Sequence, residues 1–307
     1  MNKKMYCQIC ESDNEFIKVV TIKNQRPQDF SANEFTYYRC SVCTYYLLDP
    51  KVSPEEINKI YEKEEYYEEL ASKPKNKFLT ALFQFKLFSS YQDFTKENIK
   101  LVSKVLDIGC GNGEFLESLQ KDGYTVYGLD PYPVAVQNTK KKIGDNKVFS
   151  GYISELKNIN ESFDAITMWH VLEHVQHPLQ DLKKINEKLN AEGKIIIEVP
   201  NADSLAFRIF GQDYNYNMIP EHIQYYNPKS ITKLCNKAGF KIIKCYTPPR
   251  ALLNFALSLK NKWNDQITST PLKVVFFLLA TPVSVLFISI SSIMDQGEVL
   301  RVVAQKE

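Results

Sequence analysis

The stretch VLDIGCGNGEFL at residues 105–116 passes from an apolar run through a glycine-rich turn into a helical pattern. Its glycines, Gly109, Gly111 and Gly113, stand at every second position and remove three side chains from one turn. Glycine lets the backbone adopt positive φ and approach a ligand closely. In a parallel sheet, ligands bind beyond the carboxyl ends of the strands, where such a turn lies. The stretch therefore predicts an α/β domain that binds a ligand at this turn.

Strand and helix patterns alternate after this turn. Strands are expected at 105–108, 124–129, 147–149, 163–168, 194–199, 241–246 and 299–304. Helices are expected at 114–121, 133–142 and 178–190, and a later one, in NPKSITKLCNKAGF, closes at Gly239. Alternation at this spacing indicates a parallel sheet with helices on both faces.

Length and charge narrow the class of protein. A chain of 307 residues can bury one large core with additions. Lys plus Arg is 38 and Asp plus Glu is 36, so the net charge of +2 gives no footprint for a nucleic acid. The start, MNKKMYCQIC, has no apolar run after its lysines, so we expect no secretory signal. Seven cysteines, with two CxxC pairs, favour a reducing, cytoplasmic compartment.

Two acids accompany the glycine turn. Asp107 lies inside the strand before the turn, and Asp130 ends the next strand in VYGLD, where it can accept hydrogen bonds from ribose hydroxyls. The glycine spacing is GxGxG, which differs from the GxGxxG of dinucleotide folds. An ordinary tight turn is the alternative, but two acids in the same strand context favour a nucleoside ligand.

The motifs VLDIGCGNGEFL, GLDP, FDAITMWHVLEHVQHP and GKIIIEVPN resemble, in this order, those of class I S-adenosylmethionine-dependent methyltransferases. The resemblance covers residues 104–246. It implies a Rossmann-like seven-stranded sheet whose last strand is antiparallel, which suits the late strand at 299–304. It also implies that S-adenosyl-L-methionine is the cofactor. A sulfonium methyl group is already activated, so positioning alone can achieve much of the transfer.

The resemblance implies a set of cofactor-binding residues. Asp107 and the turn would hold the methionine end, Asp130 the ribose, and the region of Pro131 and Tyr152 the adenine. Many members carry an acid beside the adenine, where this chain has Tyr152 and Ser154. Trp169 and His170 follow the fourth strand and should therefore face the same cleft. The full set is Asp107, Gly109, Cys110, Gly111, Gly113, Asp130, Pro131, Tyr152, Trp169 and His170.

The acceptor side has candidates in two segments. IPEHIQYYNP places Glu221 and His222 between the fifth strand and its next helix, which is the usual acceptor region of the family. We expect His222 to act as a base or to position the acceptor, with Glu221 as its partner; a salt link or loop hydrogen bond is the alternative. His174, in WHVLEHV, is a third catalytic candidate, or it merely forms a hydrogen bond in its loop.

Four cysteines form two knuckles, Cys7-x2-Cys10 and Cys40-x2-Cys43. Four thiolates from two such turns make the closed tetrahedral cage that Zn²⁺ prefers, so the ion would be structural. Four unrelated cytosolic thiols are the alternative. The arrangement resembles the N-terminal zinc module of some sugar C-methyltransferases, where the module helps to enclose the acceptor.

Residues 274–294 carry no charge and are long enough to cross a bilayer. If 299–304 is the last strand of the sheet, however, only residues 295–298 remain for the return, a reach of roughly 14 Å. A hydrocarbon core of about 30 Å cannot be recrossed by that reach. Pro282 is also expected to break the segment. We therefore favour a helical insertion that dips into one leaflet, with membrane contact through 250–294; a dimer interface or internal core, and a true span, are the alternatives.

Composition and rhythm divide the chain into five parts. Ser53, before Pro54 and two glutamates, marks a helix start, and a second helical stretch with basic and Phe residues is expected at 73–104. The five parts are a zinc-ribbon-like module at 1–50, a helical linker or cap at 51–104, the methyltransferase core at 105–247, the hydrophobic helical insertion at 248–298 and the final strand at 299–307.

The sequence therefore predicts a methyltransferase with a small-molecule acceptor. The cysteine module, the Glu–His loop and the apolar insertion favour a sugar or sugar-linked lipid in bacterial surface-glycan synthesis, at the inner face of the cell membrane. The alternative is O-methylation of an isoprenoid quinone precursor or another lipid. A non-catalytic binding domain of the same fold is a third reading, and a homodimer is compatible with all three.

Overall fold

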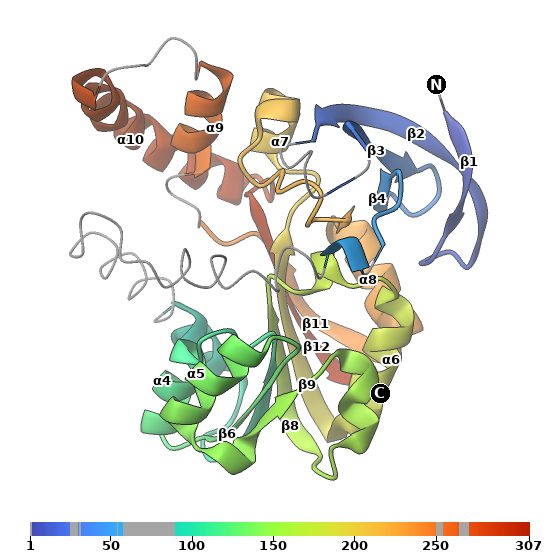
Figure 1. Cartoon of the computed structure of the whole chain (residues 1–307), viewed down its shortest axis with the longest axis vertical. Helices are drawn as coiled ribbons and strands as arrows, with labels where there is room; N and C mark the ends of the chain where they lie inside the picture. The colour runs from blue at the N-terminus through green and yellow to red at the C-terminus, as the bar shows by residue number, and fades with distance from the viewer. Residues whose placement is uncertain are drawn as a thin grey trace.

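The computed structural model describes residues 2–24, 30, 32–53, 55–57, 90–249, 254–263 and 270–307, with the backbone alone at 270–279. These residues form a seven-stranded sheet and a five-stranded sheet. Figure 1 shows the smaller sheet and helices α7, α9 and α10 grouped on one side, beyond the carboxyl ends of the central strands. The small sheet and these three helices therefore lie over one edge of the large sheet.

The large sheet has the strand order β11-β12-β9-β8-β5-β6-β7. The central strands are parallel, and β12 is antiparallel to both β9 and β11. This topology confirms the predicted seven-stranded sheet with an antiparallel last strand. The strands are β5 (Lys104–Ile108), β6 (Thr125–Asp130), β7 (Val148–Ser150), β8 (Phe163–Trp169), β9 (Leu189–Pro200), β11 (Phe240–Tyr246) and β12 (Val299–Lys306).

Both faces of the large sheet are buried, which explains the continuous apolar runs in its strands. Alternate residues point to opposite faces, so Leu106 and Ile197 belong to one core cluster while Val105 and Ile196 belong to another. Helices α6 and α8 cover the first face, and α4, α5 and the helix at 90–98 cover the second. Their bounds are α4 (Glu114–Lys121), α5 (Pro133–Ile143), α6 (Pro178–Lys188) and α8 (Pro228–Lys237).

The five-stranded sheet is antiparallel and has the order β1-β2-β3-β4-β10. Its last strand, β10, comes from the loop predicted to hold the acceptor and pairs with β4. The N-terminal module is therefore not self-contained, which the sequence did not indicate. The strands are β1 (Lys3–Cys7), β2 (Ser12–Lys23), β3 (Glu34–Cys40), β4 (Tyr46–Asp49) and β10 (Gln224–Tyr225).

Short helices and two longer ones complete the described chain. The one-turn elements are η1 (Asp145–Lys147), η2 (Ile153–Asn158), η3 (Leu172–His174) and η4 (Gly211–Asp213). The insertion before β12 contains α9 (Asn254–Lys262) and α10 (Thr270–Ile293), and α7 (Leu205–Phe210) follows β9. Among the described residues, no helix is both long and apolar enough to cross a membrane.

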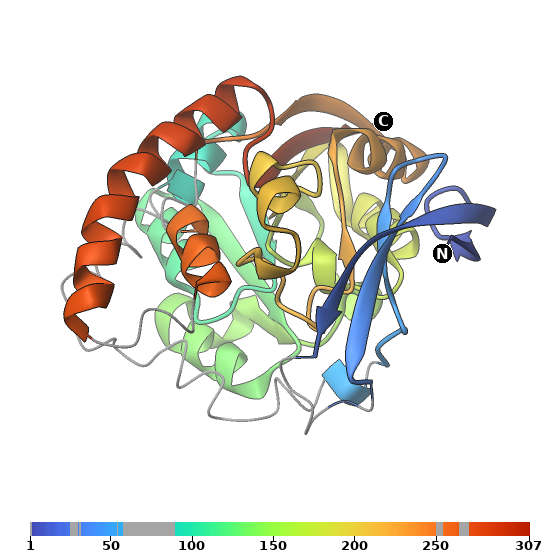
Figure 2. The same cartoon turned by 90° about the horizontal axis from the view of Figure 1, so that it is seen from above.

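The expected break at Pro282 is wrong, because α10 continues through it. Proline removes one N–H from the helix and frees the carbonyl four residues earlier. Pro282 is exposed, so its ring lies on the solvent side of the helix, away from the packed side. Figure 2 shows α10 as one helix along the side of the molecule opposite the N-terminal sheet.

Only part of the predicted helical linker at 51–104 lies within the described residues. Ser53 and Glu56 form the reciprocal hydrogen bonds of a capping box, with Glu56 N–H donating to Ser53 Oγ at 3.1 Å, and 55–57 are helical. The predicted helix start at Ser53 is thus confirmed, while 58–89 lie outside the described residues. The second stretch was predicted too long, since its helix ends at Asn98 and 99–103 form a turn before β5.

Candidate active site

The glycine turn joins β5 to α4, and its three glycines have positive φ values between +53° and +79°. A Cβ on Gly109 would lie 2.5 Å from Val171, and one on Gly113 would lie 2.7 Å from Thr139 and 3.0 Å from its backbone. A Cβ on Gly111 would meet nothing within 4 Å. Gly109 and Gly113 therefore permit close packing, whereas Gly111 leaves open space for a ligand.

Asp130 lies at this open space. Its carboxylate accepts hydrogen bonds from the N–H groups of Gly111 and Tyr132, each at 3.0 Å. Burial raises the pKa of Asp130 to about 6, although these two N–H groups lower it. The carboxylate therefore points toward the glycine turn and is ionised near neutral pH. Bare backbone beside a carboxylate fits a ribose with two hydroxyl donors.

Asp107 is also buried, at the end of β5. It accepts a hydrogen bond of 2.6 Å from Thr167 Oγ1 on the neighbouring strand β8. Burial raises its pKa to about 8, and the nearby charge of Asp130 adds to the rise. A ligand that brings a positive charge to this carboxylate would favour its ionised form.

The other residues predicted around the cofactor differ in position. Cys110 is buried, with Sγ 3.8 Å from Thr139 Oγ1, so its side chain faces the packed helices. Tyr152 is exposed, and Pro131 is half-buried beside Asp130. An acid does occur at this turn, because Glu155 folds back to accept a hydrogen bond from the N–H of Tyr152. Glu155 was not among the predicted residues, although its capping position three residues after Tyr152 could have indicated it.

Trp169 ends β8 and is held by an aromatic cluster. Its ring stacks on Tyr91, with centroids 4.1 Å apart, and meets the edge of Phe115. The guanidinium of Arg301 lies 4.4 Å from the ring centre of Phe94 and 5.4 Å from that of Trp169. Trp169 Nε1 is buried with no hydrogen-bond partner among the described residues. Tyr91 and Arg301 had no local sequence signal, since they come from distant segments.

His170 follows Trp169 in a left-handed conformation, with φ +56°. Its Nδ1 lies 3.2 Å from Glu173, and its Nε2 lies 3.3 Å from Glu198. Burial lowers the pKa of His170, but the two carboxylates outweigh burial and raise it to about 9. His170 is therefore an imidazolium at neutral pH. Glu198 is fixed in turn by Arg301 Nε at 2.8 Å.

The Glu–His pair of the acceptor loop is buried. His222 Nδ1 lies 3.3 Å from Tyr225 OH, and Nε2 lies 3.9 Å from Glu173 Oε1. Burial and the neighbouring His174 lower the pKa of His222 to about 3, so its imidazole is neutral. His174 Nδ1 forms a 2.9 Å hydrogen bond with the backbone carbonyl of Glu221, which is the loop contact considered above.

Glu173 lies at the centre of this group, a position that the sequence did not indicate. It is fully buried, and three histidines, His170, His174 and His222, influence its charge. Burial opposes its ionisation, but the His170 hydrogen bond and the nearby histidines hold the pKa of Glu173 below its ordinary value. Its Oε2 has no hydrogen-bond partner among the described residues. Ligand atoms of Glu173, His174 and His222 lie within 4.8 Å of one another, so these side chains could also hold a cation.

The tyrosines around the loop have mixed positions. Tyr214 and Tyr226 are buried core residues. Tyr216 is half-buried, and its ring lies nearly parallel to that of His170, with centroids 5.9 Å apart. Of these three tyrosines, Tyr216 is the one that lies beside a predicted cleft residue, His170.

The N-terminal sheet holds the acceptor loop directly. Tyr37 OH donates to the backbone carbonyl of His222 at 2.5 Å, and its ring stacks on Tyr225 with centroids 4.7 Å apart. Tyr45 OH donates to the side-chain carbonyl of Gln224, whose amide donates to the carbonyl of Leu172 at 2.8 Å. The module therefore fixes both His222 and the segment that carries Glu173.

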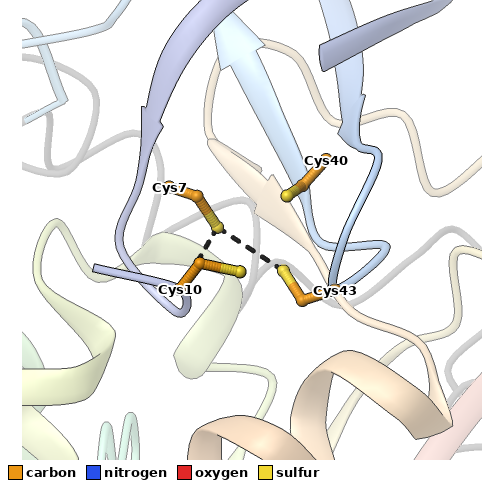
Figure 3. A group of neighbouring side chains, drawn as sticks. All are labelled: Cys7, Cys10, Cys40 and Cys43. Carbon is orange, nitrogen blue, oxygen red and sulfur yellow. Dashed lines mark hydrogen bonds between the residues drawn. The ribbon is translucent and has the colours of Figure 1, made fainter. Parts of the chain in front are cut away.

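The four predicted metal ligands come together at the tip of this sheet (Figure 3). Their sulfur atoms lie within 4.8 Å of one another, and Cys7 Sγ is 3.4 Å from Cys43 Sγ. Lys233 Nζ, on α8, lies 3.3 Å from Cys10 Sγ. Four converging sulfurs fit a tetrahedral Zn²⁺ site, and Lys233 would offset part of its negative charge. The other three cysteines are buried or half-buried, as expected.

Comparison with known proteins identifies the class. A family model described as a methyltransferase domain matches residues 81–244. Magnesium protoporphyrin IX methyltransferase from Synechocystis PCC 6803, solved with bound SAH, aligns with a TM-score of 0.52 at 13% identity, over 83% of this chain and 100% of that one. A SAM dependent methyltransferase from Archaeoglobus fulgidus aligns with a TM-score of 0.50 at 20% identity, over 74% and 99%.

The curated relatives are named as O-methyltransferases. Ubiquinone biosynthesis O-methyltransferase of Coxiella burnetii (strain RSA 493) is 27% identical over 161 residues, which cover 49% of this chain and 69% of the relative. The mitochondrial protein of that name in Schizosaccharomyces pombe is 31% identical over 119 residues, covering 37% and 43%. The chain belongs to the methyltransferase-domain family. It is an S-adenosylmethionine-dependent methyltransferase of class I.

The glycine turn gives a prediction that separates folding from ligand binding. Gly111→Ala and Gly113→Ala both place alanine at positive φ, which costs roughly 1–2 kcal/mol of folding free energy. Gly113→Ala adds a clash with Thr139 and should lower the unfolding temperature more. Gly111→Ala should lower the affinity for S-adenosylhomocysteine at least about tenfold, or 1.4 kcal/mol, in calorimetry, because its methyl group enters the ligand space.

Gly144→Ala is the matched control, since Gly144 has φ +100° and open space around it but lies at the end of α5. It should show the backbone strain without loss of affinity. Equal affinity of the Gly111→Ala and Gly144→Ala proteins would contradict the ligand position.

Asp130 predicts a pH dependence of cofactor binding. The ribose hydroxyls need the ionised carboxylate, and the pKa of Asp130 is about 6 without ligand. As pH falls below 6 the carboxyl becomes protonated, so the dissociation constant for S-adenosylhomocysteine should rise by about tenfold per pH unit. Above that pH Asp130 should contribute no slope. The slope should vanish in Asp130→Asn, and its persistence there would assign the titration to another group.

Proposed function

We propose that this methyltransferase transfers a methyl group to a hydroxyl of a small acceptor held beside His222. The supporting observation is that His222 is buried, neutral and next to Glu173, while the glycine turn and Asp130 lie at the carboxyl ends of β5 and β6. A hydroxyl acceptor needs a base close to the methyl group. The His222 imidazole is unprotonated and lies 3.9 Å from Glu173; because a pKa of about 3 makes it a weak base, the role requires that the carboxylate stabilise the imidazolium once an acceptor is bound.

The first candidate acceptor is an isoprenoid quinone precursor or another lipid with a ring hydroxyl. The relatives named ubiquinone biosynthesis O-methyltransferase support it, because they favour O-methylation over the sugar acceptor expected from the sequence. An apolar acceptor also agrees with the uncharged stretch at 274–294. The protein would then work at the inner face of the cell membrane, where such lipids are accessible.

The second candidate is a sugar or a sugar-linked lipid in surface-glycan synthesis. Its support is the cysteine module, whose sheet is continued by the strand β10 of the Glu221–His222 loop. A module that forms one wall of the acceptor region would suit a polar ligand. Tyr216, stacked beside His170, offers a ring face to either a sugar or an aromatic head group.

The residues would divide the work as follows. When bound, S-adenosyl-L-methionine supplies a methyl group on a positively charged sulfur. Asp107 would hold its charged methionine end and Asp130 its ribose, both at the glycine turn. His222 would accept the acceptor's hydroxyl proton, and Glu173, 3.9 Å from its Nε2, would stabilise the resulting imidazolium. His170 is already protonated between two carboxylates, so it would orient groups in the cleft and not accept a proton.

A structural zinc ion is the second proposed cofactor. Cys7, Cys10, Cys40 and Cys43 would fill all four positions, which leaves no open site for catalysis. The ion would fix the ends of β1 and β3, and through this sheet the acceptor loop. It would thus support activity from a distance while the large sheet binds the cofactor independently.

The acceptor and the base can be tested together. We expect labelled methyl transfer to an extract of isoprenoid quinone precursors, identified by mass spectrometry, in preference to nucleotide-sugars or sugar-linked lipids. His222→Ala should lower kcat about a hundredfold or more, which is the usual contribution of a general base, while affinity for S-adenosylhomocysteine stays nearly unchanged.

His177→Ala serves as the control, because His177 is exposed at the start of α6. It should leave kcat unchanged. A His222→Ala protein that loses cofactor affinity in proportion to kcat would have a structural defect, and methylation confined to the sugar pools would replace the first candidate by the second.

The zinc proposal predicts about one zinc ion per chain by elemental analysis. Cys7→Ser/Cys43→Ser should release it and reduce acceptor turnover, while the affinity for S-adenosylhomocysteine is retained, because the cofactor residues belong to the other sheet. Cys245→Ser, outside the cluster, should retain both metal and turnover. Wild-type protein without bound metal would contradict the proposal. Metal that remains bound after the double substitution would indicate a site at Glu173, His174 and His222.

A further inference from the structure

Over residues 280–293, the part of α10 whose side chains are described, the helix has its apolar side toward the solvent. Its exposed fractions are 54% at Val283, 63% at Leu286, 45% at Ile290 and 84% at Ile293. The spacing of three and four residues places these side chains along one face of the helix. Val285 and Met294 are exposed as well and widen that face. We refer to these six residues as the outer face.

In the same part of α10, the side that faces the protein carries two serines. Ser284 and Ser291 are buried there, next to Ile288. Their hydroxyls donate to carbonyls of the same helix, Ser284 to Ala280 at 2.7 Å and Ser291 to Ile288 at 3.1 Å. The inward serines are therefore satisfied within the helix. A helix on a protein surface in water normally shows the opposite arrangement.

The orientation of α10 is fixed by packing against the body of the protein. Phe287 contacts Phe255 of α9 with ring centroids 4.3 Å apart, and Phe255 contacts Phe210 at the end of α7. Figures 1 and 2 both show α9 between α10 and α7, with α10 on the outside of the molecule. The outer face is thus held away from the protein.

Lysines of α9 and a groove of mixed charge lie beside α10. Lys260 and Lys262 stand in the last turn of α9, which packs against α10, and the exposed Trp263 follows them. At the C-terminal end of α10, Met294 borders a groove of about 830 Å³. The charged residues lining it are Lys18, Arg39 and Arg208, together with Asp203 and Asp295. An uncharged face between basic and aromatic residues is typical of helices that lie in the interface of a bilayer.

We propose that the outer face of α10 docks onto a membrane that contains anionic phospholipids, with the helix axis in the membrane plane. The apolar side chains enter one leaflet, and the flanking lysines and arginines contact the head groups. This surface specifies the membrane contact proposed above but does not depend on the methyl acceptor. It would place the carboxyl edge of the large sheet, which α7 and α9 also border, near the lipid surface.

Two other occupants fit the observations less well. A span is disfavoured because β12 starts at Val299, directly after α10, and returns to the large sheet. In a two-fold dimer through α10 with the helices side by side and parallel, the lysines of α9 would meet like charge. A second copy, with a net charge of +2, offers no excess of negative charge in either arrangement. An anionic leaflet offers charge opposite to these lysines.

Vesicle flotation tests the proposal with the whole 307-residue chain. Wild-type protein should float with vesicles of phosphatidylcholine and phosphatidylglycerol, less so at high salt because charge contributes to binding. Leu286→Glu/Ile290→Glu should reduce the bound fraction at least about tenfold, because two carboxylates would have to enter the leaflet. Leu101→Glu/Ile243→Glu adds the same charge at exposed apolar sites elsewhere and should float like wild type.

Affinity for S-adenosylhomocysteine, measured on all three proteins, should be the same and shows that each is folded. Failure of the wild-type protein to float would overturn the proposal. So would equal flotation of the two double variants. A wild-type dimer that becomes monomeric in Leu286→Glu/Ile290→Glu, without vesicle binding by either, would assign the outer face to a second copy of the chain.

Discussion

The buried carboxylate of Glu173 connects the two halves of the candidate site. It lies against His170, which follows the strand β8, and against His222, which belongs to the loop before α8. A charged group in this position is costly to bury unless charges and hydrogen bonds compensate it. The His170 imidazolium, whose hydrogen bond lowers the pKa of Glu173, supplies this compensation, while the neutral His222 lies beside the same carboxylate. A displacement of either side that separated Glu173 from His170 would therefore leave an uncompensated buried charge.

The large sheet and the glycine turn could be predicted because their signals are local. Apolar runs between glycines and helix starts identify each strand, and the order of the motifs gives the sheet. The close agreement of α4, from Glu114 to Lys121, reflects a turn that stops at Gly113 and a basic residue at the end of the helix. The four cysteines were equally visible, since each knuckle needs two residues in one short turn.

The central part of the site could not be predicted because its contacts join distant segments. Glu173 was visible in the sequence, but its role depends on His222 from another loop. The strand β10 has two residues, too few for a periodic pattern, and exists because β4 offers a free edge. Arg301 similarly reaches Glu198 from a neighbouring strand. Pro282 shows the converse. Proline predicts a break, but α10 continues through Pro282, which is exposed while the opposite side of the helix packs on the protein.

The arrangement of the additions around the large sheet restricts what the acceptor can be. The cysteine module holds the loop with His222 on one side, and α9 and α10 lie on the other side of the same edge. The module side is rich in tyrosine hydroxyls that hold the loop, whereas the apolar face of α10 points away from the protein. The apolar face is therefore suited to a surface outside the molecule, and the buried Glu173–His222 pair to a polar group within it. Taken together, the proposed base and the proposed membrane face would suit an amphipathic acceptor whose hydroxyl-bearing end reaches His222 while its apolar part stays in the leaflet.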